Sequence, residues 1–177
     1  MKEIVEQVLK EYFLKMREPK LEELQLWDTP LLQTAGCCFV TLYKNGEVRW
    51  SAGNVKEIHP NLALECIANT MQALTGDKRF SPLTLEEAES IQIRTDTITA
   101  RDMIHSSDIE SIDPVKCGMI AIHRDYEKLA VVLPNMSPKL MTGNDFIPVL
   151  KNKLNDASID DKNYILYKIE TNTESNY

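Results

Sequence analysis

The chain has 177 residues, of which 43% are hydrophobic and 27% charged, and its formal net charge is −7. A chain of this length can bury a core as one domain, or as one domain with a small lobe, without disulfides or a structural metal. The acidic balance argues against nucleic acid and anionic membranes as main partners. No apolar run approaches the ~20 residues that span a bilayer, and residues 1–7 carry acids where a signal peptide is apolar, so we expect a cytoplasmic protein.

An amphipathic helix is predicted for residues 3–17, where apolar residues recur at helical spacing and Pro19 follows. Residues 21–27 suggest a short second helical turn. Asp28-Thr29-Pro30 marks a break, and residues 31–36 are expected to run extended into the next element.

A β-hairpin is predicted around Asn45-Gly46, because this dipeptide tolerates the positive φ angles of a tight turn between two β-rich runs. With a two-residue loop the opposed pairs are Lys44–Glu47, Tyr43–Val48, Leu42–Arg49, Thr41–Trp50 and Val40–Ser51. Alternation then puts Arg49 and Ser51 on one face of the hairpin. A guanidinium is rarely buried without a partner, so Arg49 needs an explanation.

The remaining elements alternate between helices and strands. Thr84 and Glu87 fit a capping box at the start of a short helix that ends near Ser90. The other expected elements are a helix from Pro60 to Gly76, strands at 91–98, 115–122, 129–133 and 164–169, and a helix at 145–154. Residues 99–114 give no clear pattern. The fold class is therefore α+β, an antiparallel sheet built from hairpins with helices on its faces, with one domain over residues 1–170 and a polar tail at 171–177.

No familiar catalytic or metal motif is present. The chain has neither a P-loop, a dinucleotide fingerprint, a nucleophile elbow nor a zinc-protease helix. Its four cysteines include no C-x-x-C pair and its three histidines are scattered, so we expect free, buried or half-buried thiols, no metal and no cofactor. His105, Ser106 and Asp108 are too close in sequence to favour a catalytic relay.

The face shared by Arg49 and Ser51 is the most promising chemistry, since a guanidinium on a rigid strand can bind a carboxylate or phosphate bidentately. The alternative is an internal ion pair of Arg49, for example with the connector at residues 77–79. Glu86, Glu87 and Glu89 are best explained as a solvated helix N-terminus.

Several segments together resemble the AMMECR-type domain family. The matching residues are Phe39-Val-Thr-Leu42, the Asn45-Gly46 turn, Val48 to Gly53, Asp77-Lys78-Arg79-Phe80 with Pro82, Glu86-Glu87 with the strand after it, Gly118-Met-Ile120 and Leu133-Pro134. They resemble the family's F-V-T-L, L-R-G-C-I-G and D-P-R-F-x-P segments and its later acidic helix, strand and L-P elements, over about residues 30–155. Ser51 stands at the family's cysteine, Trp50 at the glycine before it and Lys78 at the proline.

The resemblance implies an α+β intracellular protein associated with a Memo-type protein and a radical SAM enzyme. Without the family's cysteine, we expect a non-catalytic binding or accessory domain that recognises an acidic small ligand or a protein partner. The predicted ligand-binding residues are Arg49, Ser51, Asp77 and Arg79, and no catalytic residue is assigned. The alternative is a transferase or hydrolase acting on a small acidic metabolite through the Arg49/Ser51 face. A third possibility is that these motif residues serve backbone geometry and packing alone.

Overall fold

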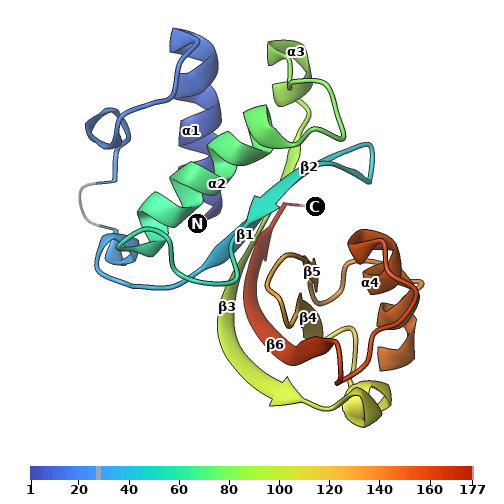
Figure 1. Ribbon diagram of the computed structural model, residues 1–177. Helices are drawn as coiled ribbons and strands as arrows, with labels where there is room; N and C mark the ends of the chain where they lie inside the picture. Colours follow the sequence, from blue (N-terminus) through green and yellow to red (C-terminus); the bar gives the residue numbers. More distant parts are fainter. Residues whose placement is uncertain (27–28, 177) are drawn as a thin grey trace. The chain divides into compact units, whose positions relative to one another are not determined.

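The computed structural model describes residues 1–26 and 29–176, which divide into two compact units. Unit 1 contains Met1–Thr97 and the chain from Thr173 on, and unit 2 is Ile98–Asn172. In the described residues the strand order is β2-β1-β3-β6-β4-β5 (Figure 1). β1 pairs antiparallel with β2 and β3, and β4 pairs antiparallel with β5 and β6. The predicted α+β class is confirmed. The single domain over residues 1–170 stays a prediction.

Unit 1 is built on the predicted hairpin, which the structure confirms as β1 (Cys38–Lys44) and β2 (Glu47–Gly53). Asn45 and Gly46 adopt φ angles of 54° and 80°, as the tight turn requires. Helix α2 (Leu62–Gly76) lies against the hairpin, and helix α1 (Lys2–Lys15) packs on α2 (Figure 1). Their apolar stripes and the hairpin form one buried cluster, which includes Val5, Val8, Leu42, Trp50 and Cys66.

The register of the hairpin differs from the prediction beyond its first two pairs. Tyr43 lies opposite Val48 as expected, but Leu42 lies opposite Trp50, because Arg49 is an extra residue in a β-bulge. The bulge shifts every later pair by one position and puts the Trp50 side chain into the core beside Leu42. Ser51 consequently lies opposite Thr41 instead of Val40, and the bulge interrupts the strict alternation from which the shared face of Arg49 and Ser51 was predicted.

The strand next to β1, β3, carries buried polar residues. Asp96 is fully buried and forms a two-pronged ion pair with Arg94 on β3 (Gln92–Ile104), with both contacts at 2.8 Å. The hydroxyl of Thr173 donates to Asp96 at 2.6 Å. The Asp96 carboxylate is thus matched by a guanidinium and a hydroxyl, which offsets the cost of burying its charge.

The connections of unit 1 contain short helical turns. The capping box of Thr84 and Glu87 is confirmed at α3 (Leu85–Ala88). Single 3-10 turns occur at Leu21–Glu23 and at Pro30–Leu32, so the extended conformation expected from residue 31 on is wrong at its start. The predictions for Trp27 and Asp28 fall outside the described residues.

Unit 2 contains the second predicted hairpin, β4 (Cys117–His123) and β5 (Leu129–Val132), together with α4 (Phe146–Leu154). Its buried cluster includes Met119, Phe146, Leu150, Tyr164 and Leu166. β3 extends to Ile104, and a 3-10 helix comes next at Ser106–Ser111. β6 runs over Tyr164–Ser175, so the polar residues 171–175, expected to be a frayed tail, are part of a strand.

All four cysteines are free thiols, three buried and Cys117 half-buried, as predicted. A hydrogen bond with the Cys66 thiol and burial together raise the pKa of the Cys38 thiol far above its usual range. The Cys38 thiol therefore stays protonated at neutral pH. In the described part of the chain, no helix is long and apolar enough to cross a bilayer.

Candidate functional site

A cleft of about 820 Å³ lies in unit 1, beside the end of β2. It is bounded by the last residues of β2, one side of α2 and the segment after α2. Its lining residues are Ser51, Ala52, Gly53, Asn54, His59, Ala68, Asn69, Gln72, Gly76, Asp77, Lys78 and Arg79. Three of the four predicted ligand-binding residues, Ser51, Asp77 and Arg79, are therefore brought together in one cavity.

Asp77 links the segment after α2 to the strand. Its carboxylate accepts from the Ser51 N–H at 3.1 Å and from the Arg79 guanidinium at 2.8 and 2.7 Å. Burial alone would raise the pKa of the Asp77 carboxyl, but these hydrogen bonds outweigh it and the pKa is lowered. Asp77 is therefore a carboxylate at neutral pH, and it neutralises Arg79.

Lys78 supplies the uncompensated positive charge of the cleft. It is exposed, and within residues 1–26 and 29–176 its ammonium group has neither a hydrogen bond nor an ion pair. An incoming carboxylate or phosphate would thus meet Lys78 as an available cation, with the Arg79 guanidinium, 58% exposed, next to it in sequence.

The wall of the cleft on α2 is held by a buried carboxylate. Glu65 is fully buried and accepts hydrogen bonds from the backbone N–H groups of Ile58 and His59 and from the Asn54 side chain. The Asn54 amide also donates to Asn69 at 3.2 Å. Glu65 therefore fixes the loop that carries Asn54 and His59 into the cleft.

Ser51 and Gly53 form the strand side of the cleft. The Ser51 hydroxyl lies 3.1 Å from the Thr41 hydroxyl, and no acid or base is hydrogen-bonded to it in the described parts of the chain. A side chain at Gly53 would collide with the ring of Phe39, so glycine is required there by close packing.

Arg49, the fourth predicted residue, does not line the cleft. Its guanidinium carbon lies 3.9 Å from the Trp50 ring centroid and 4.9 Å from that of Phe80. It donates to the Ser81 hydroxyl at 2.9 Å and lies 3.9 Å from a Glu87 oxygen. The predicted alternative, an internal ion pair, therefore describes Arg49 better, with Glu87 as the partner.

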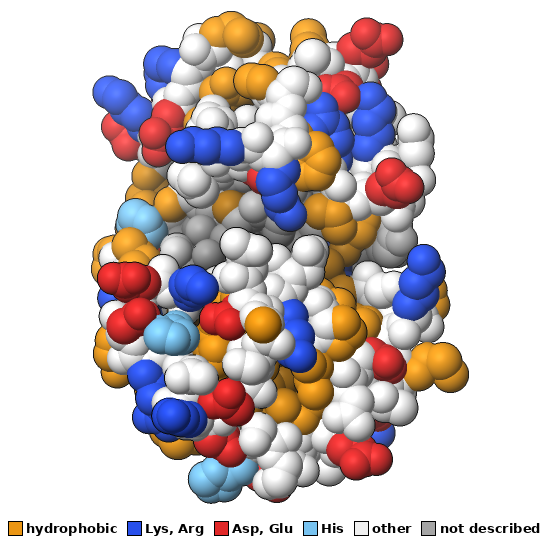
Figure 2. Space-filling view, turned by 45° about the vertical axis from the view of Figure 1, so that its right-hand side comes forward, with side chains coloured by type: hydrophobic (Ala, Val, Ile, Leu, Met, Phe, Trp, Pro, Cys, Tyr) orange, Lys and Arg blue, Asp and Glu red, His pale blue; other side chains and the backbone are white. Residues whose placement is uncertain are grey.

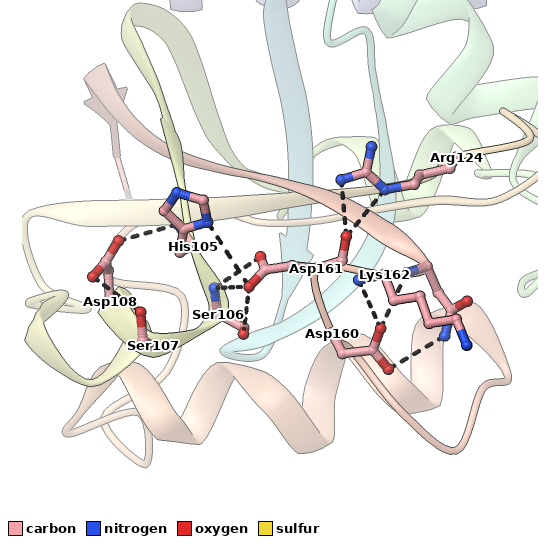
Figure 3. A network of polar contacts seen from close by, with 9 residues as sticks. His105, Ser106, Ser107, Asp108, Arg124, Asp160, Asp161 and Lys162 are labelled. Atoms are coloured by element: carbon pink, nitrogen blue, oxygen red, sulfur yellow. Dashed lines mark hydrogen bonds and ion pairs between the residues drawn. The ribbon is translucent and has the colours of Figure 1, made fainter.

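The Ser/His/Asp sequence of unit 2 forms an exposed polar network, shown in Figure 3. Asp161 accepts from the Ser106 hydroxyl at 2.8 Å, and its carboxylate lies 3.9 Å from the His105 ring. Its backbone oxygen accepts from Arg124. Because Asp161 contacts both the serine and the histidine, the histidine does not stand between them as a relay requires. His105 is also 82% exposed. The network therefore ties turns together.

Other surface features give weaker indications of a site. On the face drawn in Figure 2, basic and acidic side chains are interspersed and no large field of one sign is visible. A second groove of about 560 Å³ lies beside α1, α3 and the start of β3; most of its lining residues are apolar, and it contains none of the predicted ligand-binding residues. No group of three or more potential metal ligands occurs in the described residues.

The residues of the cleft that sequence reasoning missed come mainly from α2 and the loop before it. Asn69 and Gln72 line the cleft one helical turn apart, and the buried Glu65 lies one turn before them, so these three residues form a polar stripe along a helix that is otherwise mostly apolar. That stripe was a usable signal. His59 and Lys78 carried none, because each stands in a loop whose position depends on the folded unit.

Comparison with known proteins identifies the family. The sequence profile of the AMMECR1 family matches residues 2–172. A protein of Thermotoga maritima is 36% identical over 85 residues, which are 48% of this chain and 48% of that protein. Protein CA_C1420 of Clostridium acetobutylicum is 33% identical over 98 residues, which are 55% of this chain and 20% of that protein. The matches thus span about half the length of the first curated relative and a fifth of the second.

The fold also occurs in a solved structure. The uncharacterised protein PH0010 of Pyrococcus horikoshii superposes with a TM-score of 0.77, at 19% identity, over 96% of this chain and 86% of that one. This likeness shows that the two chains share a fold.

Proposed function

The chain belongs to the AMMECR1 family, and we propose that it is a non-catalytic binding domain whose cleft beside β2 holds an acidic group of a small ligand or a protein partner. The observation that carries the proposal is the uncompensated Lys78 in a cleft of about 820 Å³. Cavities of this size suit small-molecule ligands. We further propose, on the family resemblance, that the ligand or partner belongs to a Memo-type and radical SAM modification system.

Binding is favoured over catalysis by the surroundings of Ser51. Its hydroxyl shares a hydrogen bond with Thr41, whereas an activated serine needs a base within hydrogen-bond reach. His59 lines the same cleft, but its described hydrogen bond is that of its backbone N–H to Glu65. The alternative of a transferase or hydrolase therefore has no observation in its favour.

Equilibrium binding of citrate, glutarate and inorganic phosphate tests the proposal. We expect at least one of these anions to bind, and Lys78→Glu to weaken it about tenfold, because the change replaces attraction by repulsion. Lys56→Glu is the matched control, since Lys56 is exposed, outside the lining and without a described partner. Equal weakening by both variants, or no binding of any of the three anions, would contradict the proposal.

A further inference from the structure

The outer edge of β2 is covered along only part of its length. Among the described strands, β2 is the first of the sheet and β1 is its single neighbour. The segment after α2 covers the other edge at Ser51, whose backbone N–H donates to the Asp77 carboxylate. The indole N–H of Trp50 also donates to the Ser81 carbonyl of this segment, at 3.0 Å. This cover ends at Ser51, and the cleft begins there. An uncovered strand edge is a template for pairing with another chain.

The direction of the backbone groups at this edge can be derived from two hydrogen bonds. The Ser51 N–H points to Asp77 and therefore away from β1. In an antiparallel strand the N–H and C=O of one residue point to the same side, and alternate residues repeat that direction. The Ser51 carbonyl and both backbone groups of Gly53 consequently face the cleft. The Asn54 N–H donates to the Cys38 carbonyl on β1, as this alternation requires.

These groups are available for a ligand. Within the described residues, no side chain or loop group is hydrogen-bonded to the Ser51 carbonyl or to the Gly53 N–H. Gly53 also has no side chain that could hinder a second backbone, and Phe39 excludes any larger residue there. Asp77 already occupies the Ser51 N–H, so the open part of the edge is centred on Gly53.

We propose that this edge binds an extended peptide of a partner protein as an added antiparallel strand, with one peptide residue paired to Gly53 and an acidic residue after it at Lys78. The inference rests on the proposed function and names its ligand class. A peptide antiparallel to β2 runs from Gly53 toward Ser51. Asp77 is hydrogen-bonded to the Ser51 N–H, so the segment that carries Lys78 is held at the Ser51 end of this edge. A carboxylate placed C-terminal to the paired residue is therefore brought to Lys78. Main-chain hydrogen bonds supply affinity in this mode and side chains supply selectivity.

Amide chemical shifts of the ¹⁵N-labelled chain test this inference with two pools of end-capped pentapeptides. In both pools four positions of the peptide are random. The fixed position is glutamate, which is the C-terminal residue in one pool and the N-terminal residue in the other. We expect the glutamate-last pool to move the Gly53 amide signal and to bind twofold to fivefold more tightly than the glutamate-first pool. Lys78→Glu should abolish this difference, and Lys56→Glu should preserve it.

The outcomes separate the inference from the proposed function. If citrate, glutarate or phosphate binds at Lys78 and neither pool moves the Gly53 signal, the peptide inference fails and the proposed function stands. Equal affinity of the two pools would overturn the antiparallel arrangement. If neither the anions nor the pools bind, both proposals fail.

Discussion

The cleft of unit 1 and the network around Asp161 in unit 2 contain similar residue types but differ in what their polar groups still offer. In the network, Asp161 is engaged by Ser106 and by the nearby His105, on an exposed surface (Figure 3). In the cleft, buried Glu65 fixes the wall while Lys78 and the Gly53 N–H have no described partner. A cavity whose wall is held in place, and whose polar groups include some without a described partner, is thus a better indication of a site than catalytic residue types that are close in sequence.

The largest expected effect comes from removing the frame of the cleft. Glu65→Ala removes a fully buried carboxylate and leaves the part-buried N–H groups of Ile58 and His59 without their acceptor, and we expect a loss of about 3 kcal/mol in the free energy of unfolding. Urea denaturation measures it. Glu65→Gln keeps an acceptor and should cost less than half as much. The matched change in the network, Asp161→Ala, should cost less than either, because Asp161 is half-buried whereas Glu65 is fully buried. A larger loss of unfolding free energy for Asp161→Ala than for Glu65→Ala would contradict the stated difference between the cleft and the network.

A second prediction concerns Arg49, which the structure places outside the cleft lining. Arg49→Ala removes the stacking on Trp50 and Phe80 and should lower the free energy of unfolding by about 2 kcal/mol. Anion binding should stay unchanged. Arg49→Lys keeps the charge and loses the planar contact, so its free energy of unfolding should lie between that of the unchanged chain and that of Arg49→Ala. Loss of anion binding by a folded Arg49→Ala variant would return Arg49 to the ligand-binding set.

The smallest effect is expected for the pH dependence of stability in unit 2. The Tyr164 hydroxyl donates to Asp156 at 2.7 Å. This hydrogen bond lowers the pKa of Asp156 to about 2, while burial and the same bond raise the pKa of Tyr164 to about 12. The Asp156 contribution is complete above its unfolded pKa of about 4 and is lost as the pH falls toward 2. The Tyr164 contribution is complete below about pH 10 and is lost as the pH rises toward 12.

Thermal unfolding between pH 2 and pH 12 measures this dependence. Tyr164→Phe should flatten the alkaline side of the profile and weaken the acid side. Phe39→Leu is a suitable control, since it changes a buried aromatic residue of unit 1 without removing a hydroxyl. An unchanged profile in Tyr164→Phe would show that this hydrogen bond does not set the pH dependence.

Local chemistry made much of the fold predictable from the sequence. Asn45-Gly46 specifies the first hairpin, and Thr84 with Glu87 specifies the start of α3. The bulge at Arg49 was not predictable, because one extra residue leaves the apolar pattern of β2 almost unchanged. The polar end of β6, from Thr171 on, was missed because its side chains are mostly exposed and show no hydrophobic alternation.

The candidate site was predictable in part. Ser51, Asp77 and Arg79 were found through motif positions, and they meet in one cleft. The frame provided by Glu65 was not foreseen, because a buried acid held by backbone N–H groups of a loop becomes visible only in the folded unit.

The binding role of the cleft is tested most directly by a residue-resolved amide chemical-shift map of the ¹⁵N-labelled chain during a citrate titration. We predict that the largest changes occur at Ser51, Gly53 and Lys78 and that the amides of Ser106 and Asp161 stay in place. Lys78→Glu should remove these changes. Changes gathered at Ser106 and Asp161, with the cleft residues unaffected, would contradict a binding role for the cleft.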